Sequence, residues 1–143
     1  MFVNAIQVTE YETAAGPYHS VVTSYPTWEF IETAIRNLDR CGFPFVWLYR
    51  NANPQHGDMP DMDVVGGLGE YAIIKNESKD GDYSYLTFVD MQRSSKDVDI
   101  WVSDQGTTMA EFQLCPDLER TLLIVRLFCE TGQLHPQADW MET

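Results

Sequence analysis

The sequence has few basic residues. Nine Lys and Arg stand against 22 Asp and Glu in 143 residues, which gives a formal net charge of −13 at pH 7. A field of this sign repels nucleic-acid phosphates and anionic membrane surfaces, and it attracts basic proteins. We therefore expect neither direct nucleic-acid binding nor membrane binding.

Long apolar runs and paired cysteines are also missing. No segment approaches the roughly 18 apolar residues of a membrane span, and the N-terminal segment has no basic stretch that would begin an export signal. Cys41, Cys115 and Cys129 are odd in number and widely spaced. This pattern favours reduced thiols over a disulfide framework or a CxxC metal site, and it indicates a cytoplasmic protein.

Catalytic motifs are absent as well. The sequence contains no HExxH, no GxSxG and no P-loop. His19, His56 and His135 lie near Gly or Pro in expected loops, without another ligand at metal-binding spacing. We expect no enzyme, no metal and no cofactor.

Two alternatives stay open at this point. One is a small hydrolase in which Glu130, Asp139 and Glu142 supply an acid and a base. The other is a small-molecule or peptide-binding module built on the Gly-rich segment 66–72, which formally contains GxGxxA. Because a strand-like run follows instead of a helix, we interpret that segment as a turn between strands, with Glu70 at its edge.

Aromatic residues are plentiful, with four Trp, seven Tyr and seven Phe, and they favour one globular domain over residues 1–143. The pattern predicts strands at 3–8, 43–49, 63–65, 71–75, 83–89, 98–102, 108–114 and 138–142, and loops at 13–25 and 51–61. Lys79–Asp82 and Asp104–Gly106 suit tight turns, so the last four strands before the second helix should form an antiparallel meander. The resulting class is α+β, with a mainly antiparallel sheet in the order strand-helix-strand, meander, helix-strand.

Two helices are predicted to pack on this sheet. The first begins after Thr27 as N-cap, carries a Glu32–Arg36 pair and ends at Cys41-Gly42. The second begins at Pro116-Asp117, is apolar nearly all round and ends at Gly132.

Acidic residues are concentrated in the middle of the chain. Residues 58–104 hold eleven acids against four bases, and we expect many of these carboxylates to form a negative rim on one side of the sheet. Alternation places Trp101 beside Asp99, opposite Ile100, where an exposed Trp would anchor a basic partner unless a helix covers that face. The predicted contact residues are Glu70, Asp97, Asp99, Trp101 and Asp104.

Three short motifs occur in a definite order: Gly67-Leu68-Gly69, then Glu130-Thr131-Gly132 at the end of the second helix, then Trp140-Met141-Glu142. With this GxG, ETG and WxE, the chain resembles immunity protein family 1 of bacterial polymorphic toxin systems. Gly132 is explained by helix termination and Trp140 by packing of the last strand. We expect Gly67, Gly69 and Glu130 to be structural too, while Glu142 could act in folding or in binding.

The resemblance implies a small cytoplasmic protein that neutralises a cognate toxin in the producing cell. Toxins paired with this family are often nucleic-acid-targeting deaminases or nucleases, and such enzymes tend to have a basic cleft. The implied mechanism is stoichiometric occlusion by an acidic surface, without turnover, by a monomer or weak dimer.

Overall fold

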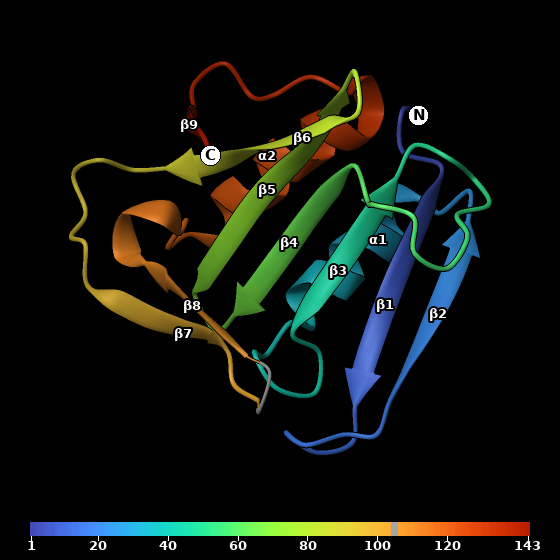
Figure 1. Cartoon of the computed structure of the whole chain (residues 1–143), viewed down its shortest axis with the longest axis horizontal. Helices are drawn as coiled ribbons and strands as arrows, with labels where there is room; N and C mark the ends of the chain where they lie inside the picture. Colours follow the sequence, from blue (N-terminus) through green and yellow to red (C-terminus); the bar gives the residue numbers. More distant parts are fainter. Residues whose placement is uncertain (104–105) are drawn as a thin grey trace.

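A seven-stranded antiparallel sheet forms the centre of the computed structural model, which describes residues 1–103 and 106–143 (Figure 1). The strand order is β2-β1-β3-β4-β5-β6-β9, and β7 and β8 form a separate two-stranded ribbon. The elements are β1 (Ala5–Tyr11), β2 (Tyr18–Ser24), α1 (Trp28–Arg36), β3 (Phe45–Tyr49), β4 (Met62–Gly67), β5 (Glu70–Lys79), β6 (Asp82–Val89), β7 (Asp97–Trp101), β8 (Thr107–Ala110), the 3-10 helix η1 (Glu111–Gln113), α2 (Leu118–Thr131) and β9 (Asp139–Glu142). The predicted α+β class with a mainly antiparallel sheet is confirmed.

Both long helices cover one face of the sheet, which we call the inner face (Figure 1). The strands alternate, so every second side chain points into the space between sheet and helices. The main core consists of such side chains and their helical partners: Ile6, Leu48, Val64, Ile73, Phe88, Ile31, Ile35, Leu122, Val125 and Phe128. Among the described residues, no helix combines the length and apolar character needed to cross a bilayer.

Helix α1 begins as predicted and ends earlier than predicted. The Thr27 hydroxyl accepts the Phe30 N–H, and Arg36 pairs with Glu32 at 2.8 Å. The helix ends at Arg36, not at Cys41-Gly42. Beyond it, the Asp39 carboxylate accepts the N–H groups of Cys41 and Phe43, so these residues form a turn that competes with the helix.

Helix α2 has both predicted ends. Asp117 caps its N-terminus by accepting the Arg120 N–H, and Gly132 ends it with a left-handed φ of 77°. Its apolar residues Leu122, Ile124, Val125, Phe128 and Cys129 are buried, whereas Leu123 is 63% exposed.

Two strand predictions are corrected. Residues 18–24, predicted as part of a loop, form β2, which is exposed along almost its whole length and therefore shows no apolar alternation. The four-strand meander is also wrong. The strand β6 pairs with β5 and β9, while β7 pairs only with β8, and the 108–114 run ends in η1.

Candidate functional site: the outer face of the sheet

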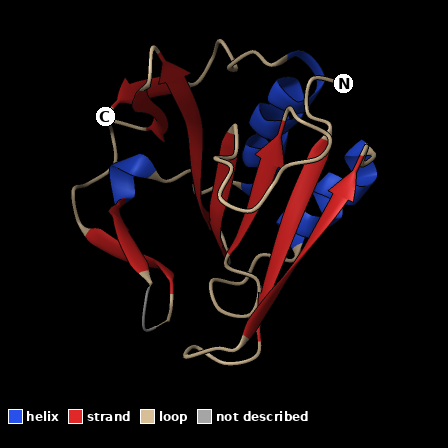
Figure 2. Ribbon diagram, turned by 45° about the vertical axis from the view of Figure 1, so that its right-hand side comes forward, coloured by secondary structure: helices blue, strands red, loops and turns tan. Residues whose placement is uncertain are grey.

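The outer face of the sheet, opposite the helices, is only partly covered. The ribbon β7–β8 lies over one part of it (Figure 2). There, Ile100 and Leu114 form a small second core with Ala72 of β5, packed against Val65 and Val98. The ribbon therefore has its own apolar attachment to β4 and β5, and Trp101 of β7 extends its contacts to Tyr11 of β1 and Phe45 of β3.

A row of five aromatic rings crosses the outer face from the edge strand β2 to β3. Tyr18 stacks on Tyr11 at 5.1 Å, and Tyr11 meets Trp101 edge to face at 5.6 Å. Trp101 then contacts Phe45 at 5.3 Å, and Phe45 stacks on Trp47 at 4.9 Å. Such rings bind apolar and cationic side chains at protein interfaces. We call these five residues the aromatic row.

A half-buried carboxylate lies beside the end of this row. Asp63 of β4 stands opposite Trp47 of β3 and Ile74 of β5 on the outer face. Burial among these neighbours raises the pKa of Asp63 to about 7, although a hydrogen bond from Asn76 Nδ2 at 3.3 Å opposes this rise. Within the described residues, neither Lys nor Arg makes an ion pair with Asp63.

Other polar groups on this face also lack partners. Asn76 Oδ1 and Trp101 Nε1 are buried without a hydrogen-bond partner in the described structure. Burial, followed by the nearby charges of Asp63, Asp58 and Asp61, raises the pKa of Tyr49 to about 12. A buried orphan polar atom costs about 1–3 kcal/mol, so several of them on one face mark it as a site that a ligand could complete.

The ion pairs of the described residues leave the aspartates without basic partners. Every carboxylate that pairs with Lys or Arg belongs to a glutamate: Glu32, Glu70, Glu77, Glu111, Glu119 and Glu130. Several aspartates instead accept backbone N–H groups in turns and helix caps, as Asp61 and Asp117 do. The excess negative charge therefore remains available to an external partner.

Comparisons of the chain with protein-family models, curated proteins and solved structures found no match. The resemblance to immunity protein family 1 therefore stays a prediction, and the site has to be judged from its own geometry.

Glu70 does not project freely from the turn. Its carboxylate accepts two hydrogen bonds from Arg93, at 2.7 and 2.8 Å. The same guanidinium donates to the carbonyls of Glu111 and Leu114. Glu70 thus fixes the segment that carries the ribbon to the start of β5, and its carboxylate is held in an ion pair with Arg93.

The other predicted contact residues are divided between two environments. Asp97 and Asp99 are exposed on β7, whereas Asp104 lies outside the described residues. Trp101 is half-buried, because a β-bulge between Asp99 and Trp101 turns both Ile100 and Trp101 toward the sheet. The predicted isolated, exposed anchor is therefore a member of the aromatic row.

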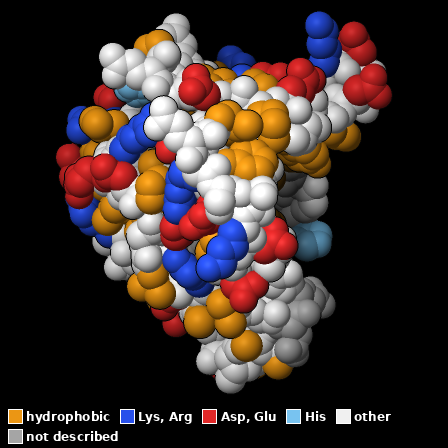
Figure 3. Space-filling model, turned by 90° about the vertical axis from the view of Figure 1, so that its left-hand side faces the viewer, with side chains coloured by type: hydrophobic (Ala, Val, Ile, Leu, Met, Phe, Trp, Pro, Cys, Tyr) orange, Lys and Arg blue, Asp and Glu red, His pale blue; other side chains and the backbone are white. Residues whose placement is uncertain are grey.

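The predicted negative rim is interrupted. On the side of the molecule that carries the ribbon, Lys and Arg side chains lie among Asp and Glu side chains (Figure 3). Charge on this side is mixed, so attraction of a basic partner depends on the whole molecule's field and on local sites such as Asp63.

The three motifs occupy structural positions. Leu68 and Gly69, with φ of 55° and 87°, form the turn between β4 and β5, as expected for a Gly-rich hairpin. A Cβ on Gly67 would lie 2.3 Å from the Leu38 carbonyl oxygen. Trp140 packs edge to face on Phe88 at 6.3 Å, and Glu142 is exposed on β9.

The three C-terminal carboxylates are all exposed. Glu130 pairs with Arg126 at 3.1 Å on α2, while Asp139 and Glu142 lie on β9. The structure does not enclose any of them in a pocket that would desolvate a catalytic acid.

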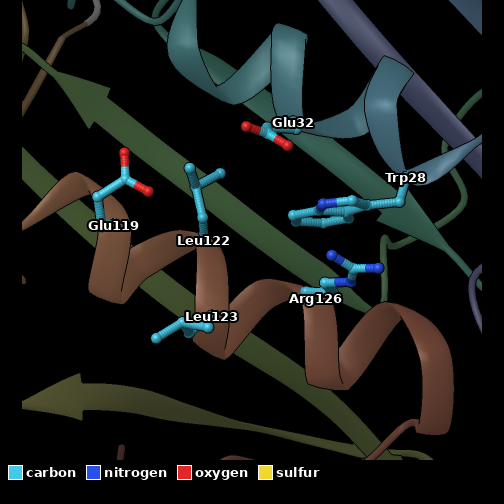
Figure 4. Close-up of a pocket in the computed structure, with 6 residues that line it drawn as sticks. All are labelled: Trp28, Glu32, Glu119, Leu122, Leu123 and Arg126. Carbon is cyan, nitrogen blue, oxygen red and sulfur yellow. The ribbon is translucent and has the colours of Figure 1, made fainter.

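A shallow groove of about 230 Å³ separates α1 from α2 on the other side of the molecule (Figure 4). The Arg126 guanidinium faces the ring of Trp28 of α1, 5.5 Å from the ring centroid. Leu122 and Leu123 contribute apolar surface. The groove holds two carboxylates, Glu32 and Glu119, both paired with Arg36. Its charges are satisfied internally, unlike those of the outer face.

Sequence reasoning missed Asp63, Asn76 and most of the aromatic row. The alternating Phe45, Trp47 and Tyr49 were a usable signal, since a strand places all three on one face. The position of Asp63 beside Trp47 depends on the register between β3 and β4, which no local pattern reveals.

Proposed function

We propose that this chain is an immunity protein that binds a basic toxin domain through the outer face of its sheet. The toxin would be a nucleic-acid-targeting deaminase or nuclease in the same cytoplasm. Inhibition would be stoichiometric, because the bound protein covers the cleft that the toxin uses for its polyanionic substrate.

The observation that carries this proposal is the half-buried Asp63 carboxylate, which has no Lys or Arg partner among the described residues. Ionising it beside Trp47 and Ile74 costs free energy in the free protein. A guanidinium or ammonium from a partner would remove that cost, and the half-buried ring of Trp47, opposite Asp63, could contact the same cation. Residues that destabilise a free protein in this way are characteristic of binding sites.

The net charge supports the same function through kinetics. Electrostatic steering raises association rate constants from about 10⁵–10⁶ toward about 10⁸ M⁻¹s⁻¹. Fast capture matters when the partner is an enzyme that damages the host's nucleic acid. The exposed Asp97 and Asp99 would contribute to steering, and Asp63 would contribute to the lifetime of the complex.

The test compares two kinds of variant against the basic domain encoded beside this gene, by surface plasmon resonance. Asp63→Asn should raise the dissociation rate constant by at least about 30-fold, since breaking a buried charge pair costs about 2 kcal/mol or more. Asp97→Lys with Asp99→Lys should mainly slow association and flatten its salt dependence.

Asp80→Asn with Asp82→Asn provides the control, because it removes two charges at the exposed β5–β6 turn. This control should leave the dissociation rate unchanged. Equal dissociation rates for Asp63→Asn and the wild type would show that the toxin does not contact Asp63 on the outer face.

A further inference from the structure

The outer edge of β2 is an unprotected strand edge. β2 is the last strand on its side of the sheet, and it is the outermost element on the right of Figure 1. An exposed edge presents a row of unpaired N–H and C=O groups that can pair with another chain.

The free groups of β2 can be assigned from its ladder with β1. The Glu12 N–H bonds to Pro17, and the Tyr25 N–H bonds to Asn4, which sets the alternation along the pair. Backbone groups therefore point away from β1 at four positions, namely Tyr18, Ser20, Val22 and Ser24. In the part of the chain that the structure describes, no backbone hydrogen bond satisfies these four N–H groups.

The other edge strands are short or charged, and β8 has only four residues. β9 is four residues long and contains Asp139 and Glu142, and β7 contains Asp97 and Asp99. β2 has seven residues, with no Asp, Glu, Lys, Arg, Pro or Gly. In a chain with 22 acids, a charge-poor edge of this length is a conspicuous exception.

The side chains of β2 also suit strand pairing. Tyr18 is 62% exposed and Val21 is 56% exposed, on opposite faces of the strand, and Val22 is also exposed. Tyr18 begins the aromatic row by stacking on Tyr11, so the edge is continuous with the proposed contact face. An added strand would extend that face without a break.

We propose that the β2 edge binds an extended segment of the basic partner as an eighth strand of the sheet, an inference that rests on the proposed function. Charge selects this occupant over a second copy of the chain, because pairing two edges would bring two molecules of charge −13 together. Glu10 and Glu12, next to the start of β2, would attract Lys or Arg at the end of the added strand.

The experiment uses an acetylated hexapeptide of alternating Lys and Val as the probe. The matched control is the same peptide with every backbone nitrogen methylated, which keeps the charge but removes the donors of a β-ladder along both edges. Binding is measured by isothermal titration, and hydrogen exchange of the β2 amides is followed by NMR.

We expect the unmodified peptide to slow exchange at Ser20 and Val22 by about tenfold or more. The methylated peptide should bind at least about tenfold more weakly. Val22→Pro should abolish the exchange effect, because it removes an outward N–H while leaving the bonds to β1. Val22→Thr keeps that N–H and should bind like the wild type.

Three results would overturn the inference. They are equal binding of both peptides, binding that Val22→Pro leaves intact, and no binding of the unmodified peptide at all. A wild-type dimer in sedimentation that Val22→Pro converts to monomer would show that a second copy is the occupant instead. In each case the proposed function would still be judged separately, by the effect of Asp63→Asn on the toxin complex.

Discussion

At the scale of single residues, the surroundings of Asp63 support the proposed binding role of the outer face. Its carboxylate lies between Trp47 and Ile74, and its one hydrogen-bond donor, Asn76 Nδ2, also donates to the Pro60 carbonyl. Glu70, by contrast, is paired with Arg93, and Asp39 and Asp117 accept backbone N–H groups. The geometry is therefore better suited to receiving a cation from outside.

The raised pKa of Asp63 gives a pH-dependent prediction. The folded protein holds the proton up to a pKa of about 7, whereas the unfolded chain releases it near the ordinary value of 3.8. The unfolding free energy should therefore fall as pH rises from about 4 to 7, by about 2–4 kcal/mol in total. Asp63→Asn should lose this contribution. In urea unfolding, the unfolding free energy of the variant should therefore increase relative to that of the wild type between pH 5 and pH 8.

Asp97→Asn is the control for this measurement, because Asp97 is exposed. Its difference from the wild type should stay nearly constant over the same pH range. A constant difference for Asp63→Asn would mean that its carboxyl is hydrated in the folded state.

At the scale of elements, Gly67 and Gly69 at the β4–β5 hairpin have different roles. Gly67→Ala should destabilise the protein by at least about 3 kcal/mol, because its Cβ would lie 2.3 Å from the Leu38 carbonyl oxygen and φ is 125°. Gly69→Ala meets no atom within 4 Å and adds only the cost of a positive φ, about 1–2 kcal/mol. Equal urea midpoints for the two variants would contradict this distinction.

The attachment of the ribbon segment to the sheet gives a second prediction at this scale. Arg93→Ala should cost about 3 kcal/mol, because it leaves the Glu70 carboxylate and the carbonyls of Glu111 and Leu114 without their donor. Arg126→Ala removes an exposed pair with Glu130 and an exposed contact with the Trp28 ring, and it should cost about 1 kcal/mol. Chemical denaturation measures both, and a similar loss in the two variants would remove the special role of Arg93.

At the scale of the whole molecule, the charge of −13 opposes the compact state by self-repulsion. Salt screens this repulsion over about 10 Å at 0.1 M. The melting temperature should therefore rise by several degrees between low salt and 0.3 M NaCl in calorimetry. Asp80→Lys with Asp82→Lys makes the net charge less negative by changing two residues at an exposed turn. This double variant should show a smaller salt-dependent rise in melting temperature. A melting temperature that falls with salt would show that internal ion pairs outweigh the repulsion.

Local chemistry was enough to predict the features that depend on a few neighbouring residues. The caps at Thr27 and Asp117, the stop at Gly132 and the turn at Leu68-Gly69 each involve groups within one helical turn or hairpin. The excess of acids and the α+β class likewise follow from composition and from the order of strand-like and helix-like runs.

Tertiary structure alone decided which distant residues meet. β2 became a strand because β1 supplies its hydrogen-bond partners, although its own residues are exposed on both faces. The Glu70–Arg93 pair and the position of Asp63 beside Trp47 depend on strand register and on chain packing. Pairing between segments far apart in the chain is determined by the collective burial of the core, so short-range patterns contain no record of it.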